Sequence, residues 1–449
     1  MANQTLMIPK NNAGSTLASG ITNVATSMSV AAGEGVRFPT TFPFPVVVFT
    51  ADLTLPWGEQ MIDMEIVLCT ARVVDVLTME RSQEGTSNVA HGAGSYVRLH
   101  ITAKFISDLN EASRKNAIIN GNFDIWQRGT SFASPADNTY IADRFCIRSG
   151  LGDGTITASR MATTVAVGFP YSYAIKVDCT AAETTVAAGE FLSIQYKVEG
   201  IDFKRFEGET ATLSFWVNAI KAGIYCVSFR NSAVDKSYVA EFTVNTTNTW
   251  EKKTVTLTFN SGGTFLYTTG IGLYVNWAIV AGSSFQVAAN SWQAGNYLAT
   301  SNQVNGLDNA ANNFYLTGVQ LELGSVATPF EFRPYQQELA LCQRYYQRLV
   351  AGAAYAIFGF GENYGTNTQA IWIPFLQEMR IAPTLAGVSN CAYYSATAGL
   401  QATTGAVSMD NISKFSMRVT DAATGTAGQA VRFIANNNVA AYVEMGCEL

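Results

Sequence analysis

The stretch TATLSFWV, residues 210–217, decides the fold class because apolar and polar side chains alternate along it. A period of two residues is that of a β-strand with one buried face. The residues of that face are Ala211, Leu213, Phe215 and Val217. The same alternation recurs at residues 255–259 and 319–323. We therefore expect several half-buried strands around a common core.

Turn signals separate these strands at short intervals. They include Asn120-Gly121, Gly152-Asp153-Gly154, Ser261-Gly262-Gly263 and Asn305-Gly306. Glycine and asparagine suit tight turns because they tolerate backbone conformations that other residues avoid. Short strands spaced by such turns predict a β-sandwich of jelly-roll type over residues 116–334.

Composition points to β structure along all 449 residues. Charged residues make up only 14%, against about 25% in an ordinary soluble domain, and aromatic residues reach 12%. β-branched and aromatic residues suit pleated, half-buried surfaces. No apolar run approaches the roughly 18 residues of a membrane span, so we expect no membrane insertion. We expect an all-β, multi-domain chain that buries apolar surface against other chains as an obligate oligomer.

Residues 1–103 form the expected N-terminal β-module. Alternation is visible in Glu65–Cys69 and again in Val76–Met79, so strands and hairpins are predicted there. The proline-rich run Phe38–Pro45 is predicted to be an extended loop, because proline lacks the N–H that a central strand needs. This loop leads into an apolar strand at Val46–Phe49.

Two short helices are expected between the β-rich parts. Residues 104–115 place Phe105, Ile106 and Leu109 at helical spacing and predict a connecting helix, short enough to need a partner. Residues 335–350 follow Pro334, which can occupy the first turn of a helix, and are predicted to introduce a β-rich C-terminal head at 351–449. The apolar seam of this second helix is Tyr335, Leu339, Cys342, Tyr346 and Leu349.

The seam has a heptad-like spacing of 4, 3, 4 and 3 residues, which is typical of helices that associate in an oligomer. An amphipathic helix that packs on its own domain has the same spacing. Two heptads do not separate the two interpretations, and both stay open.

The chain lacks the patterns of most catalytic, cofactor and metal sites. A net charge of −6 without a basic stripe argues against nucleic-acid binding. The seven cysteines are scattered singly with no CxxC pair, so we interpret them as buried thiols and predict neither a zinc site nor a disulfide scaffold. Only two histidines occur, His91 and His100, and we expect His91 to lie exposed in its glycine-rich turn. We expect no cofactor and no catalytic residue, and a protein that is not an enzyme.

Glycosidase chemistry is the one class that sequence leaves open, since it needs only two carboxylates about 5 to 10 Å apart. The candidate pairs are Asp137 with Asp143 and Glu199 with Asp202. Surface or structural roles are commoner for acids in an all-β chain. The chain also lacks the coil repeats of a catalytic β-helix.

The first part of the chain resembles the N-terminal module of phage tail proteins. The resemblance is carried by Glu65–Val67, Thr70–Arg72, Leu77–Thr86 and Ala90-His91. The family has Arg-Gly where this chain has Arg81-Ser82. In that family the module lies next to the virion. The resemblance therefore implies that residues 1–112 bind other virion proteins.

Further segments resemble parts of phage tail fibres. Those similar to the carbohydrate-binding-module-like jelly rolls of the fibres are 116–130, Tyr140–Phe145, Leu213–Val217 and Trp250–Lys253. Those similar to the stretch that closes the jelly roll and opens the C-terminal part are Gly318–Gly324, Thr328–Glu331 and Glu338–Tyr346. The resemblance implies a fibre-type subunit.

Five aromatic residues are candidates for contact with a surface glycan, since an aromatic face can stack on a sugar ring. They are Trp126, Trp292, Trp372, Tyr393 and Tyr394. Trp126 lies near Arg128, Asp143 and Arg144, and we prefer to interpret this group as a core tryptophan beside a satisfied ion pair. The other four lie in polar, loop-like surroundings and are the better candidates for exposed contacts.

The functional hypothesis from the sequence is a structural virion protein of a tailed phage, a fibre-type subunit that attaches the particle to a glycan or protein of the host cell surface. Resemblance to phage fibres implies a homotrimer. Such a protein would be assembled in the bacterial cytoplasm and be extracellular in the mature virion. The alternatives are an architectural collar, head-fibre or decoration protein without receptor binding, and a glycan depolymerase.

Overall fold

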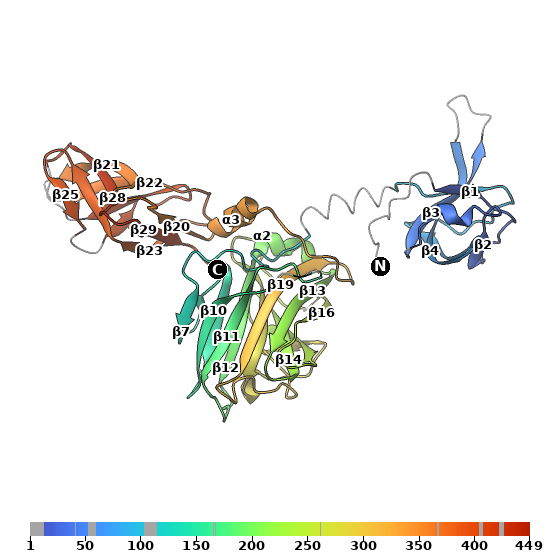
Figure 1. Cartoon of the computed structure of the whole chain (residues 1–449), viewed down its shortest axis with the longest axis horizontal. Helices are drawn as coiled ribbons and strands as arrows, with labels where there is room; N and C mark the ends of the chain where they lie inside the picture. Colours follow the sequence, from blue (N-terminus) through green and yellow to red (C-terminus); the bar gives the residue numbers. More distant parts are fainter. Residues whose placement is uncertain are drawn as a thin grey trace. The chain divides into compact units, whose positions relative to one another are not determined.

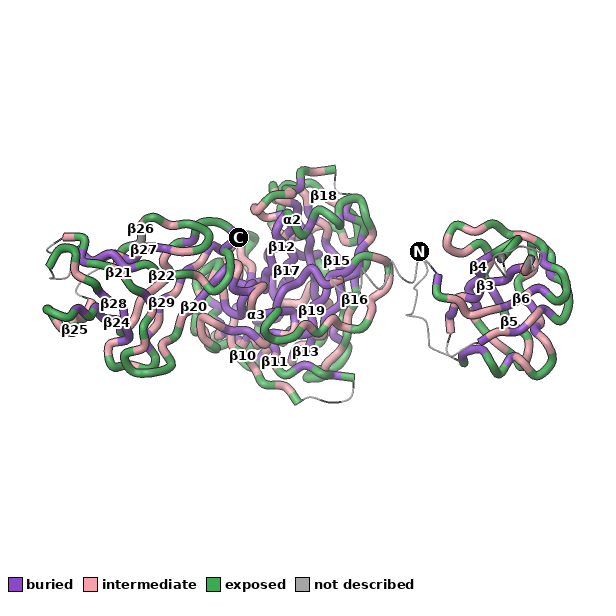
Figure 2. The backbone as a smooth tube through the Cα atoms, turned by 90° about the horizontal axis from the view of Figure 1, so that it is seen from above, coloured by how far each residue is buried: buried purple, intermediate pink, exposed green. Residues whose placement is uncertain are grey.

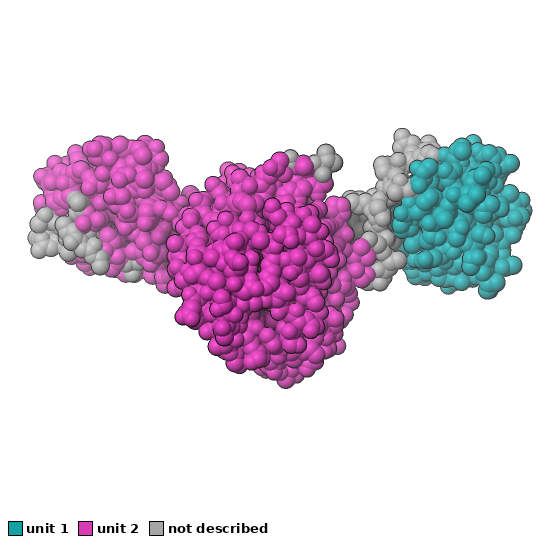
Figure 3. All heavy atoms as spheres, turned by 60° about the horizontal axis from the view of Figure 1, so that its bottom comes forward, with its two compact units in different colours: residues 1–115 teal, residues 116–449 magenta. Residues whose placement is uncertain are grey.

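The computed structural model describes residues 13–40, 42–52, 60–102, 115–164, 166, 168–260, 262–365, 368–403, 407–421 and 426–449. The chain divides into two compact units, residues 1–115 and 116–449, each coloured separately in Figure 3. Both units are built from antiparallel strands, which confirms the all-β prediction. The predicted connecting helix at 104–115 lies, apart from residue 115, outside the described residues.

The described residues of unit 1 form a six-stranded sheet with the strand order β1-β6-β3-β4-β5-β2. Its strands are β1 (Gly14–Thr16), β2 (Ser27–Ser29), β3 (Phe44–Asp52), β4 (Gln60–Val73), β5 (Val76–Gln83) and β6 (Tyr96–Arg98), with one 3-10 turn, η1 (Gly35–Arg37). Alternation places Val67, Leu77 and Met79 in a common core, as the sequence pattern predicted.

Pro45 departs from the expectation that the proline-rich run ends before the strand. Strand β3 begins at Phe44, and Pro45 pairs with Leu68 of β4. On its other side β3 is joined by β6 only from Val47 onward. At Pro45 the strand therefore has one neighbour, and a missing N–H is tolerated at such an edge.

His91 is buried, so the prediction of a solvent-exposed loop histidine is wrong. Its residue is only 3% exposed, and its Nε2 lies 3.4 Å from Oε2 of Glu65. Arg81 donates from Nε to the other oxygen of the same carboxylate at 2.6 Å. Burial lowers the pKa of His91. Arg81 and His91 thus surround one buried acid inside unit 1.

Residues 116–334 form a sandwich of two sheets, in agreement with the predicted jelly roll (Figure 1). The first sheet, in spatial order, is β16 (Glu251–Thr258), β13 (Thr210–Ala219), β19 (Asn313–Leu323), β11 (Tyr173–Ala181), β10 (Thr155–Ala162) and β7 (Ser131–Ala133). The second is β18 (Trp292–Ala294), β15 (Lys236–Val244), β14 (Gly223–Asn231), β17 (Ile271–Ala281), β12 (Phe191–Glu199), β9 (Phe145–Gly150) and β8 (Thr139–Tyr140). Three short helical turns join them: α2 (Gly200–Phe203), η2 (Lys204–Phe206) and η3 (Ser283–Phe285).

The core of the sandwich lies between the two sheets, where Figure 2 shows β12 and β17 largely as buried tube. Leu213 and Phe215 of β13 are fully buried there, as the opening stretch predicted. Trp277 of β17 is the largest side chain to be fully enclosed. Leu323, predicted to share the inward face, is exposed because it is the last residue of β19.

The predicted helix over 335–350 is wrong in its second half. Helix α3 spans Tyr335–Gln343, and the chain then enters strand β20 (Tyr346–Val350). Tyr346 and Leu349 therefore lie on a strand, because β20 pairs with the last strand of the chain. Long-range pairing overrides the local helical spacing here.

The five seam residues consequently do not share one helical face. Tyr335 is exposed, whereas Cys342 packs with Ile119 and Ile125 of the sandwich and Leu339 lies against the same cluster. Within this chain, α3 packs on its own domain through Cys342 and Leu339, and association through the seam stays a prediction.

The head contains a small and a large sheet. The small one is β20, β29 (Tyr442–Gly446) and β23 (Thr384–Ser389). The large one, in spatial order, is β25 (Gly399–Ala402), β24 (Cys391–Ser395), β28 (Ala430–Ala435), β21 (Ile357–Gly365), β22 (Thr368–Pro374), β27 (Ser416–Asp421) and β26 (Ser408–Asp410). Ile371, Phe433 and Val443 belong to the core that joins the two sheets.

All seven cysteines are buried and unpaired, as predicted. Burial raises the pKa of the Cys226 thiol to about 11. Within the described residues no cluster of potential metal ligands occurs. No helix in that part of the chain has the length and apolarity to cross a bilayer.

Candidate functional site

Strand pairing in the large head sheet places one residue from each of its seven strands in a single line across the sheet. The line, which we call the head row, is Leu400, Tyr394, Arg432, Phe360, Trp372, Arg418 and Asp410. Directly opposed residues of antiparallel strands have Cβ atoms about 4.5–5.5 Å apart. The head row is therefore a continuous strip of side chains from seven separate segments.

The alternation of the strands turns the head row toward solvent. In β22, Ile371 and Ile373 are fully buried, whereas Trp372 between them is 46% exposed. In β24, Tyr393 is 1% exposed and Tyr394 is 42% exposed. At these positions β22 and β24 thus point one side chain into the head core and the next one out.

A pocket of about 380 Å³ opens at one end of the head row. Its walls are Tyr355, Ile357, Tyr394, Leu400, Arg432 and Ile434. The guanidinium carbon of Arg432 lies 6.0 Å from the centre of the Tyr394 ring. The site combines aromatic and aliphatic walls with one cation, and such a site can accept a flat, partly apolar ligand.

The two arginines of the head row differ in their partners. Arg418 donates from Nε to Oδ1 of Asp410 at 2.6 Å, and this hydrogen bond lowers the pKa of the Asp410 carboxyl. Arg432 forms no ion pair with any carboxylate of the described residues. The positive charge of the head row is therefore concentrated at Arg432, beside the pocket.

The structure brings together two of the five predicted contact residues. Trp372 and Tyr394 both lie in the head row. Tyr393 does not contact solvent, because the alternation of β24 points its ring into the core, 5.0 Å from the Phe433 ring. The prediction of Tyr393 as a surface contact is wrong.

The two predicted glycan contacts of the sandwich, Trp126 and Trp292, pack against the protein and do not project into solvent. Trp126 is buried and donates from Nε1 to the backbone oxygen of Phe123 at 2.7 Å, which agrees with the interpretation as a core residue. Trp292 is partly buried against Tyr238 and donates to the backbone oxygen of Thr258 at 2.9 Å. Both indoles already have their hydrogen-bond acceptor.

Sequence reasoning missed Phe360 and Arg432. Phe360 is 62% exposed, the most exposed aromatic ring of the head row. It lies on β21, residues 357–365, which is rich in glycine. Apolar and polar residues alternate only in part there, so the sequence pattern did not predict a strand. Arg432 stands between the apolar residues Val431 and Phe433, which are buried. This alternation is the sequence signal that could have predicted an exposed arginine on a strand.

The charged residues near Trp126 form a buried junction between the sandwich and the head. Arg144 pairs with Glu448 and donates to the backbone oxygen of Lys197 at 2.7 Å. Arg128 donates to the other oxygen of Glu448 at 2.9 Å and lies 3.7 Å from Asp143. We call these residues the junction cluster.

Asp143 of the junction cluster is held by Gln127, whose backbone and side-chain nitrogens each donate to it at 2.7 Å. Burial raises the pKa of Asp143 to about 6. Its carboxyl is enclosed and points away from solvent, so its role in the fold is structural.

The other candidate carboxylates also have structural partners or stand apart. Glu199 accepts hydrogen bonds from Arg344 at 2.8 Å and from the Tyr345 hydroxyl at 2.5 Å. Asp202, three residues later, is exposed. Asp137 pairs with Arg148 at 2.7 Å on the surface. Asp137, Asp143 and Glu199 therefore have structural partners. Asp202 is the one candidate carboxylate for which no such partner is described.

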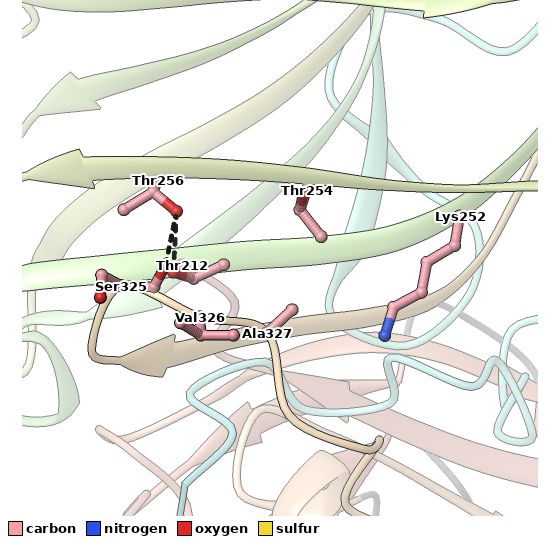
Figure 4. Close-up of a pocket in the computed structure, with 7 residues that line it drawn as sticks. All are labelled: Thr212, Lys252, Thr254, Thr256, Ser325, Val326 and Ala327. Carbon is pink, nitrogen blue, oxygen red and sulfur yellow. Dashed lines mark hydrogen bonds between the residues drawn. The ribbon is translucent and has the colours of Figure 1, made fainter. Parts of the chain in front are cut away.

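A second, shallow pocket of about 350 Å³ lies on the sandwich, on the outer side of β13 and β16 (Figure 4). Thr212, Thr254, Thr256 and Ser325 supply hydroxyl groups, and Lys252 stands at one end. The Thr212 and Thr256 hydroxyls lie 3.0 Å apart and bond each other. Because the Thr212 and Thr256 hydroxyls already bond each other, the pocket offers a ligand fewer free hydroxyl groups than its lining suggests.

No protein-family model matches the chain, and no curated protein matches its sequence. Solved structures that match the chain include carbohydrate-binding proteins, at low sequence identity. A structure titled CBM4 structure and function is 14% identical, with a TM-score of 0.24 over 46% of this chain and 98% of that one. The CBM22-2 xylan-binding domain from Paenibacillus barcinonensis is 15% identical, with a TM-score of 0.24 over 43% and 99%. A putative sugar-binding protein from Bacteroides thetaiotaomicron is 15% identical, with a TM-score of 0.27 over 47% and 100%. Likeness at this level assigns no ligand to the chain.

Proposed function

We propose that this protein is a structural subunit of a tailed bacteriophage particle that attaches the virion to a glycan of the host cell surface through the head row. The observation that carries the proposal is the alignment of Tyr394, Phe360 and Trp372 on one exposed sheet face. Large exposed apolar patches on a folded protein mark interaction sites. The phage part of the proposal rests on the sequence resemblance.

The chemistry of the head row suits a sugar chain. Aromatic rings present flat apolar faces to the C–H side of a pyranose ring. Arginine presents hydrogen-bond donors to its oxygens. The face is open rather than enclosed, so the contact with each sugar is small and the affinity per site is weak, in the millimolar range. Many copies on one particle would raise this affinity through multivalency.

The division of labour follows from the two compact units. Unit 1 carries the phage-like motif and has its own core, and unit 2 carries the head row. Unit 1 would bind other virion proteins, and the head would bind the host. A chain without residues 1–115 should still bind the glycan but should be absent from assembled particles. Normal incorporation of that chain would contradict the anchoring role.

Oligomerisation is part of the proposal, and we expect a homotrimer. Light scattering on the purified chain should give about three times the mass of one chain, as the fibre resemblance implies. A clean monomer at micromolar concentration would contradict it. The seam residues are not offered as the interface, because α3 packs on its own chain.

The experiment for glycan attachment compares two exposed aromatic residues of the head. Trp372→Ala removes a ring of the head row, and Phe415→Ala removes an exposed ring outside it. Binding of the full chain to an array of bacterial surface polysaccharides should weaken about tenfold for the first variant and stay unchanged for the second. Binding by the wild type to none of the polysaccharides, or equal binding by both variants, would overturn the proposal.

The absence of hydrolysis belongs to the same proposal. A shallow face can hold a sugar but does not enclose it, whereas hydrolysis needs paired carboxylates in a cleft. We expect no release of reducing ends from any polysaccharide that the chain binds. Release that Asp143→Asn or Glu199→Gln abolishes would establish a depolymerase instead.

A further inference from the structure

We infer that the glycan bound on the head is acidic, and that a carboxylate of one of its sugars pairs with Arg432. The inference rests on the proposed function and names the class of its ligand: a polysaccharide with uronic-acid-type sugars. The head row presents a cation that the chain's described carboxylates leave unpaired, directly beside the apolar pocket.

The position of Arg432 makes it the centre of the contact. It stands on β28, with Tyr394 opposite it on one neighbouring strand and Phe360 opposite it on the other. A guanidinium is planar and offers parallel N–H donors that match the two oxygens of a carboxylate. The Tyr394 and Phe360 rings lie on either side of Arg432. A sugar ring can therefore stack on one of them while its carboxylate pairs with the guanidinium.

Arg418 shows what a structural arginine looks like on the same face. It lies three strands from Arg432 in the same row, and Asp410 of the neighbouring strand accepts its hydrogen bond at 2.6 Å. The pair is neutral as a whole. No acid stands directly opposite Arg432, because the residues paired with it on the two neighbouring strands are a tyrosine and a phenylalanine.

One acid does lie near Arg432 on the exposed face. Glu362 follows Phe360 by two residues on β21 and pairs in register with Ala430 and Ala370. It is therefore a diagonal neighbour of Arg432, about 7–8 Å away between backbones. Its negative charge opposes an acidic ligand, so its removal should raise the affinity.

The pocket wall completes the fit. Its volume of about 380 Å³ lies near the small end of ligand pockets, which span roughly 300–1,000 Å³. Ile357, Leu400 and Tyr394 line it beside the guanidinium. This arrangement gives a sugar ring an apolar wall while its carboxylate faces Arg432.

The test uses the full chain and an array of bacterial polysaccharides, each printed in its native form and after chemical reduction of its carboxylates to alcohols. The wild type should bind native acidic polysaccharides and lose about tenfold or more of the signal on their reduced forms. Arg432→Gln should lower binding to the native forms by a similar factor. Arg160→Gln, which removes an exposed arginine beside Tyr173 on the sandwich and outside the head row, should not. Glu362→Gln should increase binding, and added salt should weaken it.

The outcomes separate the inference from the proposed function. Equal binding to native and reduced polysaccharides, with Trp372→Ala still damaging, would overturn the acidic ligand and leave glycan attachment standing. Binding that Arg432→Gln leaves unchanged would also overturn the inference. Binding to no polysaccharide in either form would overturn the proposed function itself. A thermal melt of each variant checks that its fold is intact.

Discussion

Arginine and tyrosine meet in two regions of unit 2, with different partners. In the junction cluster, Arg144 lies 3.5 Å from the centre of the Tyr345 ring, is fully enclosed and pairs with Glu448. On the head row, Arg432 lies 6.0 Å from the centre of the Tyr394 ring and is exposed, with no described carboxylate paired to it.

The difference teaches what distinguishes a structural cation from one that is free for a ligand. At the junction the chain supplies a carboxylate for the enclosed guanidinium of Arg144, because a buried charge without a partner is strongly unfavourable. On the head row, water can solvate Arg432, so the fold needs no partner for it. A solvated, unpaired cation between two rings keeps its donors for a ligand.

The largest expected effect comes from breaking the junction cluster. Glu448→Ala would leave Arg144 and Arg128 buried with one carboxylate fewer. We expect a loss toward the upper end of about 3–5 kcal/mol in the free energy of unfolding, measured by urea denaturation of the full chain. Glu448→Gln, which keeps an acceptor, should lose less. A loss within about 0.5 kcal/mol for Glu448→Ala would show that the cluster does not hold the junction.

Two adjacent tyrosines sharpen the comparison further. Tyr393→Ala empties a core position and should lower the free energy of unfolding by about 3–5 kcal/mol. Tyr394→Ala removes an exposed ring of the head row and should change stability by less than about 0.5 kcal/mol while weakening glycan binding. Urea denaturation and array binding on both variants measure the two effects. Similar stability losses for both variants would contradict the observed orientation of β24, in which Tyr393 faces the core and Tyr394 faces solvent.

The buried carboxyl of Asp143 predicts a dependence of stability on pH. Its folded-state pKa is raised to about 6, above the ordinary value of 3.8. Between these values the folded protein holds a proton that the unfolded chain has released, so stability falls as pH rises from about 4 to about 6. The fall is about 3 kcal/mol at most, from ~1.4 kcal/mol for each pKa unit. Denaturation from pH 4 to pH 7 should show this slope in the wild type and lack it in Asp143→Asn.

The smallest expected effect is at the exposed pair of the head row. Arg418→Gln removes a surface ion pair with Asp410, and exposed pairs of this kind contribute little. The urea midpoint should match that of the wild type within error. A clear destabilisation would mean that the exposed arginines of the head row have a structural role, which would weaken the contrast with the junction.

The strand pattern around residues 210–217 and the buried, unpaired state of the cysteines were predictable from sequence, because both follow from local alternation and residue type. The second half of the 335–350 helix was not. Its residues pair with a strand about 100 positions later in the chain, and local spacing cannot reveal that partner. The burial of His91 was not predictable for a similar reason, since Glu65, the acid that it contacts, is 26 residues away in the sequence.

The sequence by itself determined that this protein is all-β and that neighbouring residues of a strand face opposite sides. It also identified Trp372 and Tyr394 as candidate contacts. Tertiary structure alone decided which side is covered, and so separated buried Tyr393 from exposed Tyr394. It also decided which charges are paired, since Arg144 meets an acid 304 positions away and Arg432 meets none among the described residues. The physical reason is that alternation is a local property of the backbone, whereas burial and ion pairing depend on which distant segments pack together.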